Sequence, residues 1–233
     1  MSRQAYASLW HRLCTGNFTR RRLSRAALEC FAAEFASRER ALVVHCVDID
    51  HRRHFPNSFV VSSRAGTEPD LRADPAYACL GSIEEGSFGL IVCTGLLEHI
   101  AEPAKLVAQF ARILRPGGRL VLSASAVFPF HGAPDNFYHY TPNGFRYLFR
   151  DWRDISVLRG SSGPFLTVAI LLQRINLQCE VFPAVRLLNE VLFRLLPPLD
   201  RLVYRQFDSM RTGPGRSEVD SMMPAMLHAV IVR

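Results

Sequence analysis

A strand, a helix, a Pro-Gly-Gly turn and a second strand follow one another in the middle of this 233-residue chain. Phe88 to Thr94 is a short apolar run, and Pro103 to Leu114 repeats apolar residues at helical spacing. Arg115-Pro116-Gly117-Gly118 then ends the helix, and Arg119 to Ser123 is again apolar. Two strands joined by a crossover helix form a parallel pair. The segment therefore predicts a doubly wound, mainly parallel α/β sheet of the Rossmann-like kind.

Further apolar runs extend this pattern on both sides. Ala41 to Cys46 and Ser58 to Ser62 precede the crossover unit, and Met226 to Val232 is predicted to form a final edge strand. The chain length suits one domain over residues 1–233. Its predicted parts are N-terminal helices over 1–38, the α/β core with a substrate loop over 39–160, a helical insertion before the last strand over 161–212, and a terminal strand region over 213–233.

Residues 184–196 carry an amphipathic helical pattern. Arg186, Glu190 and Arg194 recur every four residues, and the other face is left to the apolar residues Val185, Leu188, Val191, Leu192 and Leu195. Packing of this apolar face in the core is the commonest use of such a helix, and it is the one we expect. Pairing with a second copy or with an active relative, and peripheral contact with an anionic membrane, are the alternatives.

The formal net charge of +7 comes almost wholly from arginine, since Lys105 is the only lysine. The densest cluster is Arg20, Arg21, Arg22 and Arg25. It is interpreted either as a solvated helix face or as a grip for phosphate groups on a nucleic acid, a lipid surface or a nucleotide-linked substrate. No nucleic-acid-binding motif accompanies the cluster, so we do not expect a nucleic-acid partner.

The cysteines and the N-terminus indicate the compartment. Six cysteines are scattered without a C-x-x-C pair, which predicts reduced thiols and no metal site. The N-terminus lacks the apolar stretch of a signal peptide, and no apolar run reaches the roughly 20 residues of a spanning helix. These features predict a cytoplasmic protein.

Two central segments carry a family resemblance. Ser87 to Ile100 includes a strand, a small-residue turn and Leu-Glu-His, and Ile113 to Gly118 closes a helix with Leu-Arg-Pro-Gly-Gly. These two segments resemble the central motifs of class I S-adenosylmethionine-dependent methyltransferases. The stretch Phe128 to Pro142 looks like members found with sugar and polysaccharide biosynthesis. The resemblance covers residues 40–152 and implies a Rossmann-like fold, S-adenosylmethionine as methyl donor and a small-molecule substrate.

The loop after the first predicted strand departs from the family. Val43 to Asp50 contains no glycine, although members use glycine there so that the backbone can approach the cofactor. The acid that usually ends the second strand is also absent, and Asp48 or Asp50 is the candidate to replace its carboxylate. The cofactor contacts that the resemblance implies are His45, Cys46, Asp48, Asp74, Cys93, Thr94, Gly95 and Leu96.

Two histidines are the candidates for general base. An imidazole titrates near neutral pH, so His99 or His131 could take a proton from a hydroxyl as the methyl group transfers. Because Glu98 and His99 stand at the start of a predicted helix, they are equally well explained as residues that cap the helix and pack against it. His131 lies in a polar, aromatic stretch suited to hydroxyl-rich substrates, whose expected substrate-binding residues are Asp135, Tyr138, His139 and Tyr140.

The sequence thus supports more than one function. The first is methyl transfer from S-adenosylmethionine to a hydroxyl of a sugar-like or other small metabolite. The second is a catalytically inactive protein of the same fold that serves as a binding or regulatory subunit, which the missing glycines favour. A third is a retained ligand site with a different nucleotide or a non-methylating reaction.

Overall fold

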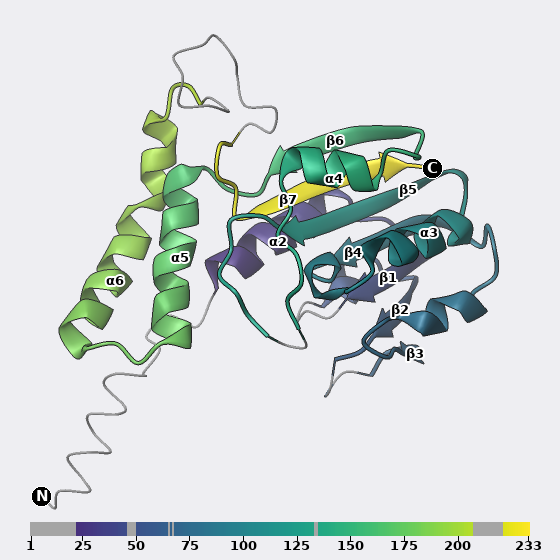
Figure 1. The fold of residues 1–233 in the computed structure, drawn as a ribbon, viewed down its shortest axis with the longest axis horizontal. Helices are drawn as coiled ribbons and strands as arrows, with labels where there is room; N and C mark the ends of the chain where they lie inside the picture. Colours follow the sequence, from purple (N-terminus) through teal and green to yellow (C-terminus); the bar gives the residue numbers. More distant parts are fainter. Residues whose placement is uncertain (1–21, 46–49, 65, 67, 133–134, 207–220) are drawn as a thin grey trace, which may run out of the picture.

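The computed structural model describes residues 22–45, 50–64, 66, 68–132, 135–206 and 221–233. Within them, seven strands form one sheet in the order β3-β2-β1-β4-β5-β7-β6 (Figure 1). The pairs among β1 to β5 are parallel, and β7 runs antiparallel to both β5 and β6. The predicted mainly parallel, Rossmann-like sheet is confirmed. The strands are β1 (Ala41–His45), β2 (Ser58–Ser62), β3 (Leu71–Arg72), β4 (Phe88–Thr94), β5 (Leu114–Ser125), β6 (Asp154–Gly160) and β7 (Met226–Val232).

Helices cover both faces of the sheet. Leu42 and Val44 of β1 pack in the larger core with Phe110, whereas Val43 between them packs on the opposite face with Phe31. A strand covered on both faces buries every residue, and all five residues of β1 are buried. The α-helices are α2 (Leu23–Glu34), α3 (Pro103–Ile113), α4 (Pro142–Leu148), α5 (Pro164–Gln178) and α6 (Pro183–Leu195). The 3₁₀ turns are η1 (His51–Arg53), η2 (Ala78–Ser82), η3 (Leu97–His99) and η4 (Pro197–Leu202).

The last strand has the predicted bounds but not the predicted place. β7 lies between β5 and β6, so the expectation of an edge strand is wrong. Two neighbours cover both edges of β7, and six of its seven residues are buried. The edge position belongs to β6, whose residues are only partly buried or exposed. Its mixed polar composition gave no apolar run from which to predict a strand.

The connection between β1 and β2 holds no α-helix in its described part. Residues 46–57 join two adjacent parallel strands, and residues 50–57 contain only the turn η1. A parallel crossover needs about a dozen residues, so this one is close to the minimum. Asp50 accepts a hydrogen bond from the backbone N–H of Arg52 and so begins the turn. The short turn places His51 in the interior, with 2% of its surface exposed.

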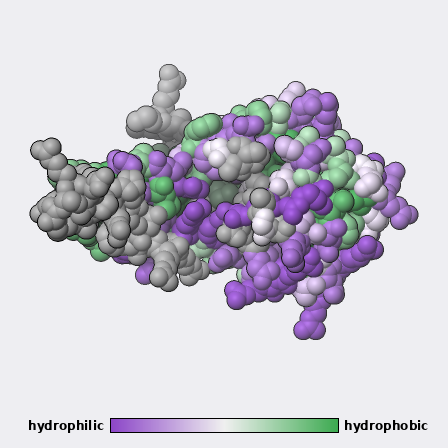
Figure 2. Space-filling view, turned by 90° about the horizontal axis from the view of Figure 1, so that it is seen from below, coloured by the Kyte–Doolittle hydropathy of each residue, from purple (hydrophilic) through white to green (hydrophobic). Residues whose placement is uncertain are grey.

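The helical insertion is present, but α6 faces the other way from the prediction. Arg186 and Glu190 are buried, whereas the apolar residues Leu188 and Leu195 are 54% and 64% exposed. The expectation that the apolar face packs in the core is therefore wrong. In Figure 1, α5 and α6 lie side by side beyond the end of the sheet, and in Figure 2 apolar residues are visible at this end of the molecule. Among the described helices, none has both the length and the apolar character to cross a membrane.

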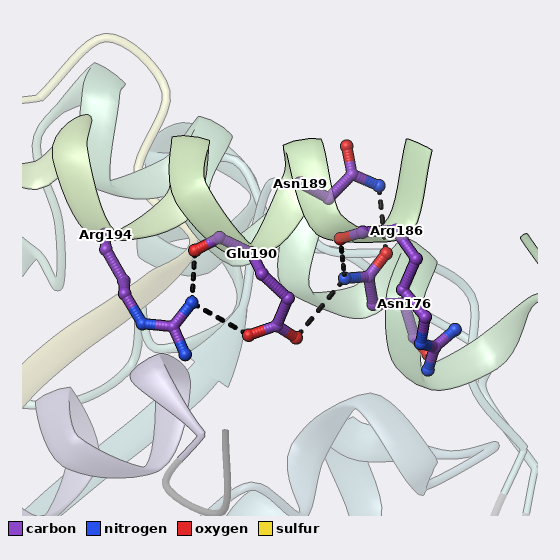
Figure 3. A network of polar contacts seen from close by, with 5 residues as sticks. All are labelled: Asn176, Arg186, Asn189, Glu190 and Arg194. Atoms are coloured by element: carbon purple, nitrogen blue, oxygen red, sulfur yellow. Dashed lines mark hydrogen bonds and ion pairs between the residues drawn. The ribbon is translucent and has the colours of Figure 1, made fainter. Parts of the chain in front are cut away.

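A polar network explains the reversed face. The side-chain amide of Asn176 on α5 donates to the carbonyl of Arg186 (3.1 Å) and to the carboxylate of Glu190 (3.4 Å), as Figure 3 shows. The guanidinium of Arg186 donates in turn to the backbone carbonyl of Asn176. The side-chain amide of Asn189 donates to the side-chain oxygen of Asn176 at 2.9 Å. Glu190 also pairs with Arg194 at 2.9 Å. Buried polar groups are tolerated when they are bonded in this way, so α6 packs on α5 through its polar face.

Candidate active site

The carboxyl ends of β4 and β5 meet at one edge of the sheet, where ligands bind in folds of this type. Two cavities of about 440 Å³ each lie there. The first, here called the basic cavity, is lined by Arg22, Arg25, Arg64, Arg174, Glu98, His99, His131, Gly95, Ser125 and Phe128, among others. The second, the apolar cavity, is lined by the segments 75–78 and 99–102 with Leu106 and Phe137, among others. His99 lies between the two cavities and lines both.

The two predicted bases meet in the basic cavity. The rings of His99 and His131 lie edge to face, with centroids 4.9 Å apart. Nδ1 of His99 is 2.5 Å from the carbonyl oxygen of Asp135, and Nδ1 of His131 is 3.1 Å from that of Pro129. A carbonyl oxygen can only accept, so both Nδ1 atoms carry the proton. In a neutral imidazole this leaves Nε2 with a free lone pair.

The surroundings of His131 favour its neutral form. Burial lowers the pKa of His131 below its ordinary value, and the nearby His99 and Arg174 lower it further, while the bond to Pro129 and the carboxylate of Glu98 oppose them. Phe128 lies edge-on to the His131 ring, with centroids 5.2 Å apart. His131 is therefore held in place and unprotonated at neutral pH, as a proton acceptor needs to be.

Glu98 is a buried carboxylate beside these histidines. Ser125 donates a hydrogen bond of 2.7 Å to one of its oxygens, and the second oxygen, Oε2, has no hydrogen-bond partner within the described residues. Only 2% of Glu98 is exposed. A buried carboxylate oxygen without a partner is costly and indicates a cationic or hydrogen-bonding ligand. From the sequence, Glu98 had only a possible structural role.

Glu98, His99 and His131 also stand close enough to share a metal ion, since one ligand atom from each lies within 4.8 Å of the others. This is a grouping that the sequence did not predict. Four arginines line the same cavity, and their charge opposes the binding of a bare divalent cation. The electrostatics of the cavity therefore disfavour a metal centre at these three residues.

The predicted cofactor contacts differ in how far they are exposed. Gly95 lines the basic cavity with a φ of 56°, a left-handed conformation that glycine adopts without strain. Cys93, Thr94 and Leu96 are buried, and Asp74 is exposed and accepts a hydrogen bond from the backbone N–H of Ala78. Cys46 and Asp48 lie outside the described residues. Asp50 caps η1 and borders a separate small cavity.

Two side chains bond across the carboxyl ends of the strands. Nε2 of His51 is 2.7 Å from the hydroxyl of Thr94, and the His51 ring lies against that of His45 with centroids 4.7 Å apart. Tyr77 donates from its hydroxyl to the carbonyl of His45 at 2.9 Å. The same hydroxyl lies 3.0 Å from that of Ser63, which follows β2 in the region where the family resemblance implies an acid. The sequence pointed to the missing acid but not to this replacement.

The predicted substrate residues hold the loop rather than line the basic cavity. The hydroxyl of Tyr140 is buried and donates to the carbonyl of Leu97, and the hydroxyl of Tyr138 donates to that of Ala101. Burial raises the pKa of Tyr140 far above its ordinary value, and Glu98 adds to the effect. His139 is exposed and bonds to Asn136. Asp135 lines the apolar cavity and bonds through its carbonyl to His99.

Comparison with known proteins identifies the family. A family model described as "Methyltransferase domain" matches residues 23–163, which is more than half of the chain. The chain belongs to this methyltransferase family. Its class is the S-adenosylmethionine-dependent, class I type that the central motifs resemble, and S-adenosylmethionine is the cofactor of this class.

Curated methyltransferases match over a shorter stretch. The chain is 32% identical over 71 residues to a ubiquinone biosynthesis O-methyltransferase of Xanthomonas oryzae, which covers 29% of this chain and 30% of that protein. A protein of the same name from Ralstonia nicotianae is 37% identical over 62 residues, covering 27% and 26%. The similarity thus spans less than a third of these relatives.

Solved structures share the fold of this methyltransferase-family chain. A SAM-dependent methyltransferase from Archaeoglobus fulgidus aligns with a TM-score of 0.53 and 13% identity, covering 98% of this chain and 100% of that one. The [4+2]-cyclase SpnF aligns with a TM-score of 0.52 and 11% identity, covering 91% and 80%. At these identities the comparison establishes the fold alone.

The side chains at this edge of the sheet can be compared with the chemical groups of S-adenosylmethionine. The bare Oε2 of Glu98 beside the basic cavity suits the α-ammonium group of S-adenosylmethionine, and the lining of the apolar cavity suits a flat adenine ring. The hydroxyl of Ser63, 3.0 Å from that of Tyr77, is a hydrogen-bonding group in the region where the family resemblance implies an acid that holds the ribose. The donor set therefore fits the cofactor, with a hydroxyl group in place of the usual carboxylate.

Proposed function

We propose that this protein transfers a methyl group from S-adenosylmethionine to a hydroxyl of a small, sugar-like metabolite, with His131 as the proton acceptor. One observation carries the proposal. The Nδ1–H of His131 is bonded to the carbonyl of Pro129, so its Nε2 lone pair is available in a cavity at the carboxyl ends of β4 and β5. Methyl transfer to oxygen requires alignment of the reactants and removal of one proton.

The cofactor supplies an electrophilic methyl group on a sulfonium sulfur. Glu98 would hold its ammonium group, Ser63 its ribose hydroxyls, and Ala78 and Ile100 the adenine. His99 fixes the segment from Asp135 onward through its Nδ1–H and lies edge to face against His131, so it positions the base. His131 accepts the hydroxyl proton at Nε2.

The hydroxyl acceptor is supported by the curated relatives, whose printed name is O-methyltransferase. It is also supported by the segment Phe128 to Pro142, which contributes Phe128 and His131 to the basic cavity and Phe137 to the apolar one. A cytoplasmic location belongs to the same proposal.

The test measures S-adenosylhomocysteine formation from S-adenosylmethionine with a panel of hydroxyl-bearing metabolites. We expect His131→Ala to lower kcat at least a hundredfold, because general base catalysis contributes about 10²–10⁴. Affinity for S-adenosylmethionine should stay within about threefold. The control is His54→Ala, which removes a histidine from a separate cavity and should leave turnover unchanged. Full turnover by His131→Ala would remove the proposed role.

A second function is favoured by a different observation. The hydroxyl of Thr94 is bonded to His51, and that of Tyr77 to the backbone of β1, so neither is free toward a cofactor in the usual pose. This supports a catalytically silent subunit that pairs with an active relative. The fold itself does not decide between an active methyltransferase and a silent subunit, since SpnF shares the fold and is named a cyclase. Binding of the cofactor without turnover on any acceptor would favour this second function.

A further inference from the structure

Arg174 is an unusual residue for the apolar helix α5. Its guanidinium lies over the ring of Phe128, 4.5 Å from the centroid, and it lines the basic cavity. Among the residues that the structure describes, no acidic side chain forms an ion pair with Arg174. A half-buried cation without a counter-charge is costly, so its position calls for an anion from outside the described chain.

Two further arginines reach the same cavity from α2. The backbone N–H of Leu23 donates to the side-chain oxygen of Gln173 at 2.9 Å, which fastens the start of α2 next to Arg174. Arg22, which directly precedes this helix, and Arg25 within it line the cavity. Burial, together with repulsion from Arg22 and Arg25, lowers the pKa of Arg174 to about 10. Like charges are thus brought together in this cavity, which is unfavourable in the absence of a bound anion.

The charge balance of the cavity indicates what anion would relieve this cost. Among the described residues that line it, Arg22 and Arg174 have no ion-pair partner, and Glu98 is the one carboxylate. One bound carboxylate group would neutralise a single positive charge. A phosphomonoester or diphosphate carries about two or more negative charges at neutral pH and presents several acceptor oxygens, which match guanidinium donors in geometry.

We propose that Arg22, Arg25 and Arg174 bind a phosphoryl group of the acceptor, so that the substrate is a phosphorylated or nucleotide-linked hydroxyl compound. This rests on the proposed function and narrows its substrate class. Phe128 lies between the arginines and the proposed base. The guanidinium of Arg174 stacks on the face of the Phe128 ring, and the centroid of the His131 ring is 5.2 Å from the centroid of the Phe128 ring. One small molecule can therefore place its phosphoryl group at Arg174 and its hydroxyl at His131.

The experiment is calorimetric titration of the full chain with inorganic pyrophosphate and, separately, with succinate as a dicarboxylate of similar size. We expect pyrophosphate to bind at one site and succinate to bind at least tenfold more weakly. Arg174→Gln should weaken pyrophosphate binding at least tenfold. The matched control is Arg150→Gln, which also removes one positive charge stacked on an aromatic ring, 4.3 Å from the centroid of Tyr147, in a different place. It should change the affinity less than twofold.

A second variant distinguishes loss of binding from loss of folding in Arg174→Gln. Arg22 is exposed, so Arg22→Gln should leave the far-UV circular dichroism and the melting temperature unchanged while it weakens pyrophosphate binding about threefold or more. Equal pyrophosphate affinity in wild type, Arg174→Gln and Arg22→Gln would overturn the inference, as would equal losses in Arg174→Gln and Arg150→Gln. Neither titration contains S-adenosylmethionine. Failure here therefore leaves the His131 test of methyl transfer untouched, and failure of that test leaves the anion site standing.

Discussion

The hydroxyl of Tyr77 donates a 2.9 Å hydrogen bond to the carbonyl of His45 and so ties η2 to the end of β1. The backbone N–H of Ser63, just beyond β2, donates to the same hydroxyl at 3.3 Å. Tyr77 adopts a φ of 57°, a left-handed conformation that is strained for a bulky residue. The bonds of its hydroxyl keep the aromatic ring at this position, between two strand ends of the candidate site.

Removal of this hydroxyl should destabilise the fold. Tyr77→Phe leaves the buried carbonyl of His45 without that donor, and we expect the free energy of unfolding in urea to fall by about 1–2 kcal/mol. Tyr147→Phe is the control, because Tyr147 is 69% exposed and should change the value by less than about 0.5 kcal/mol. Equal stability of Tyr77→Phe and wild type would contradict the bridging role.

The polar interface of α5 and α6 should depend on Asn176. Asn176→Ala removes partners from the buried Arg186, Asn189 and Glu190 together, and we expect a loss of about 2–4 kcal/mol in urea unfolding. Ile175→Ala alters the adjacent residue, which is 43% exposed, and should cost less than about 1 kcal/mol. If both variants unfold at the same urea concentration, the network does not hold the helices together.

Acid should destabilise the protein through His228. This residue of β7 is stacked on Phe31, with centroids 4.1 Å apart, and burial together with Arg159 lowers its pKa to about 3. In the unfolded chain an ordinary histidine takes up its proton below about pH 6.5. The unfolded state then binds more protons than the native state, so stability falls as the pH drops from 6.5 toward 3, by about 1.4 kcal/mol per unit at most.

Urea titrations at pH 7.0 and 5.5 measure this effect. His228→Phe keeps an aromatic ring against Phe31 and removes the titrating group, so it should reduce the loss of stability between the two pH values by about 1 kcal/mol. His54→Phe serves as the control and should leave the loss as in wild type. An unchanged loss in His228→Phe would mean that other groups account for the acid sensitivity.

Chelation tests the electrostatic argument against a metal ion. Because four arginines line the cavity that holds Glu98, His99 and His131, we expect methyl transfer to persist after treatment with EDTA and gel filtration. Elemental analysis of the treated protein monitors removal. Loss of turnover on chelation with recovery on addition of Zn²⁺ or Mn²⁺ would instead make the three residues metal ligands.

The sheet was predictable because its strands are short apolar runs. Ser58–Ser62 and Phe88–Thr94 match the prediction to the residue, since strands buried on both faces cannot include polar side chains without cost. The place of β7 was not predictable, because order in a sheet depends on the long-range pairing with β6. The orientation of α6 was missed for a related reason. Its polar face finds buried partners on α5, which lie in another part of the chain.

The candidate site was predicted in part. His99 was found from the Leu-Glu-His segment and His131 from the polar, aromatic loop, and the structure brings them together. Glu98 looked like part of a helix start, and only its burial reveals the oxygen without a partner. Arg174 lies in an apolar stretch where nothing local marks it as a ligand-binding residue. Its role depends on α2 being fastened beside it, a contact between residues 23 and 173.

The measurement that tests the central claim most directly is calorimetric titration of the full chain, stripped of carried-over ligand, with S-adenosylmethionine and S-adenosylhomocysteine. We expect both to bind at one site with micromolar affinity. Glu98→Gln should weaken both at least tenfold, because each ligand carries the same ammonium group. If neither ligand binds to the wild-type protein, the site does not accept the cofactor of its family, and methyl transfer by this chain is contradicted.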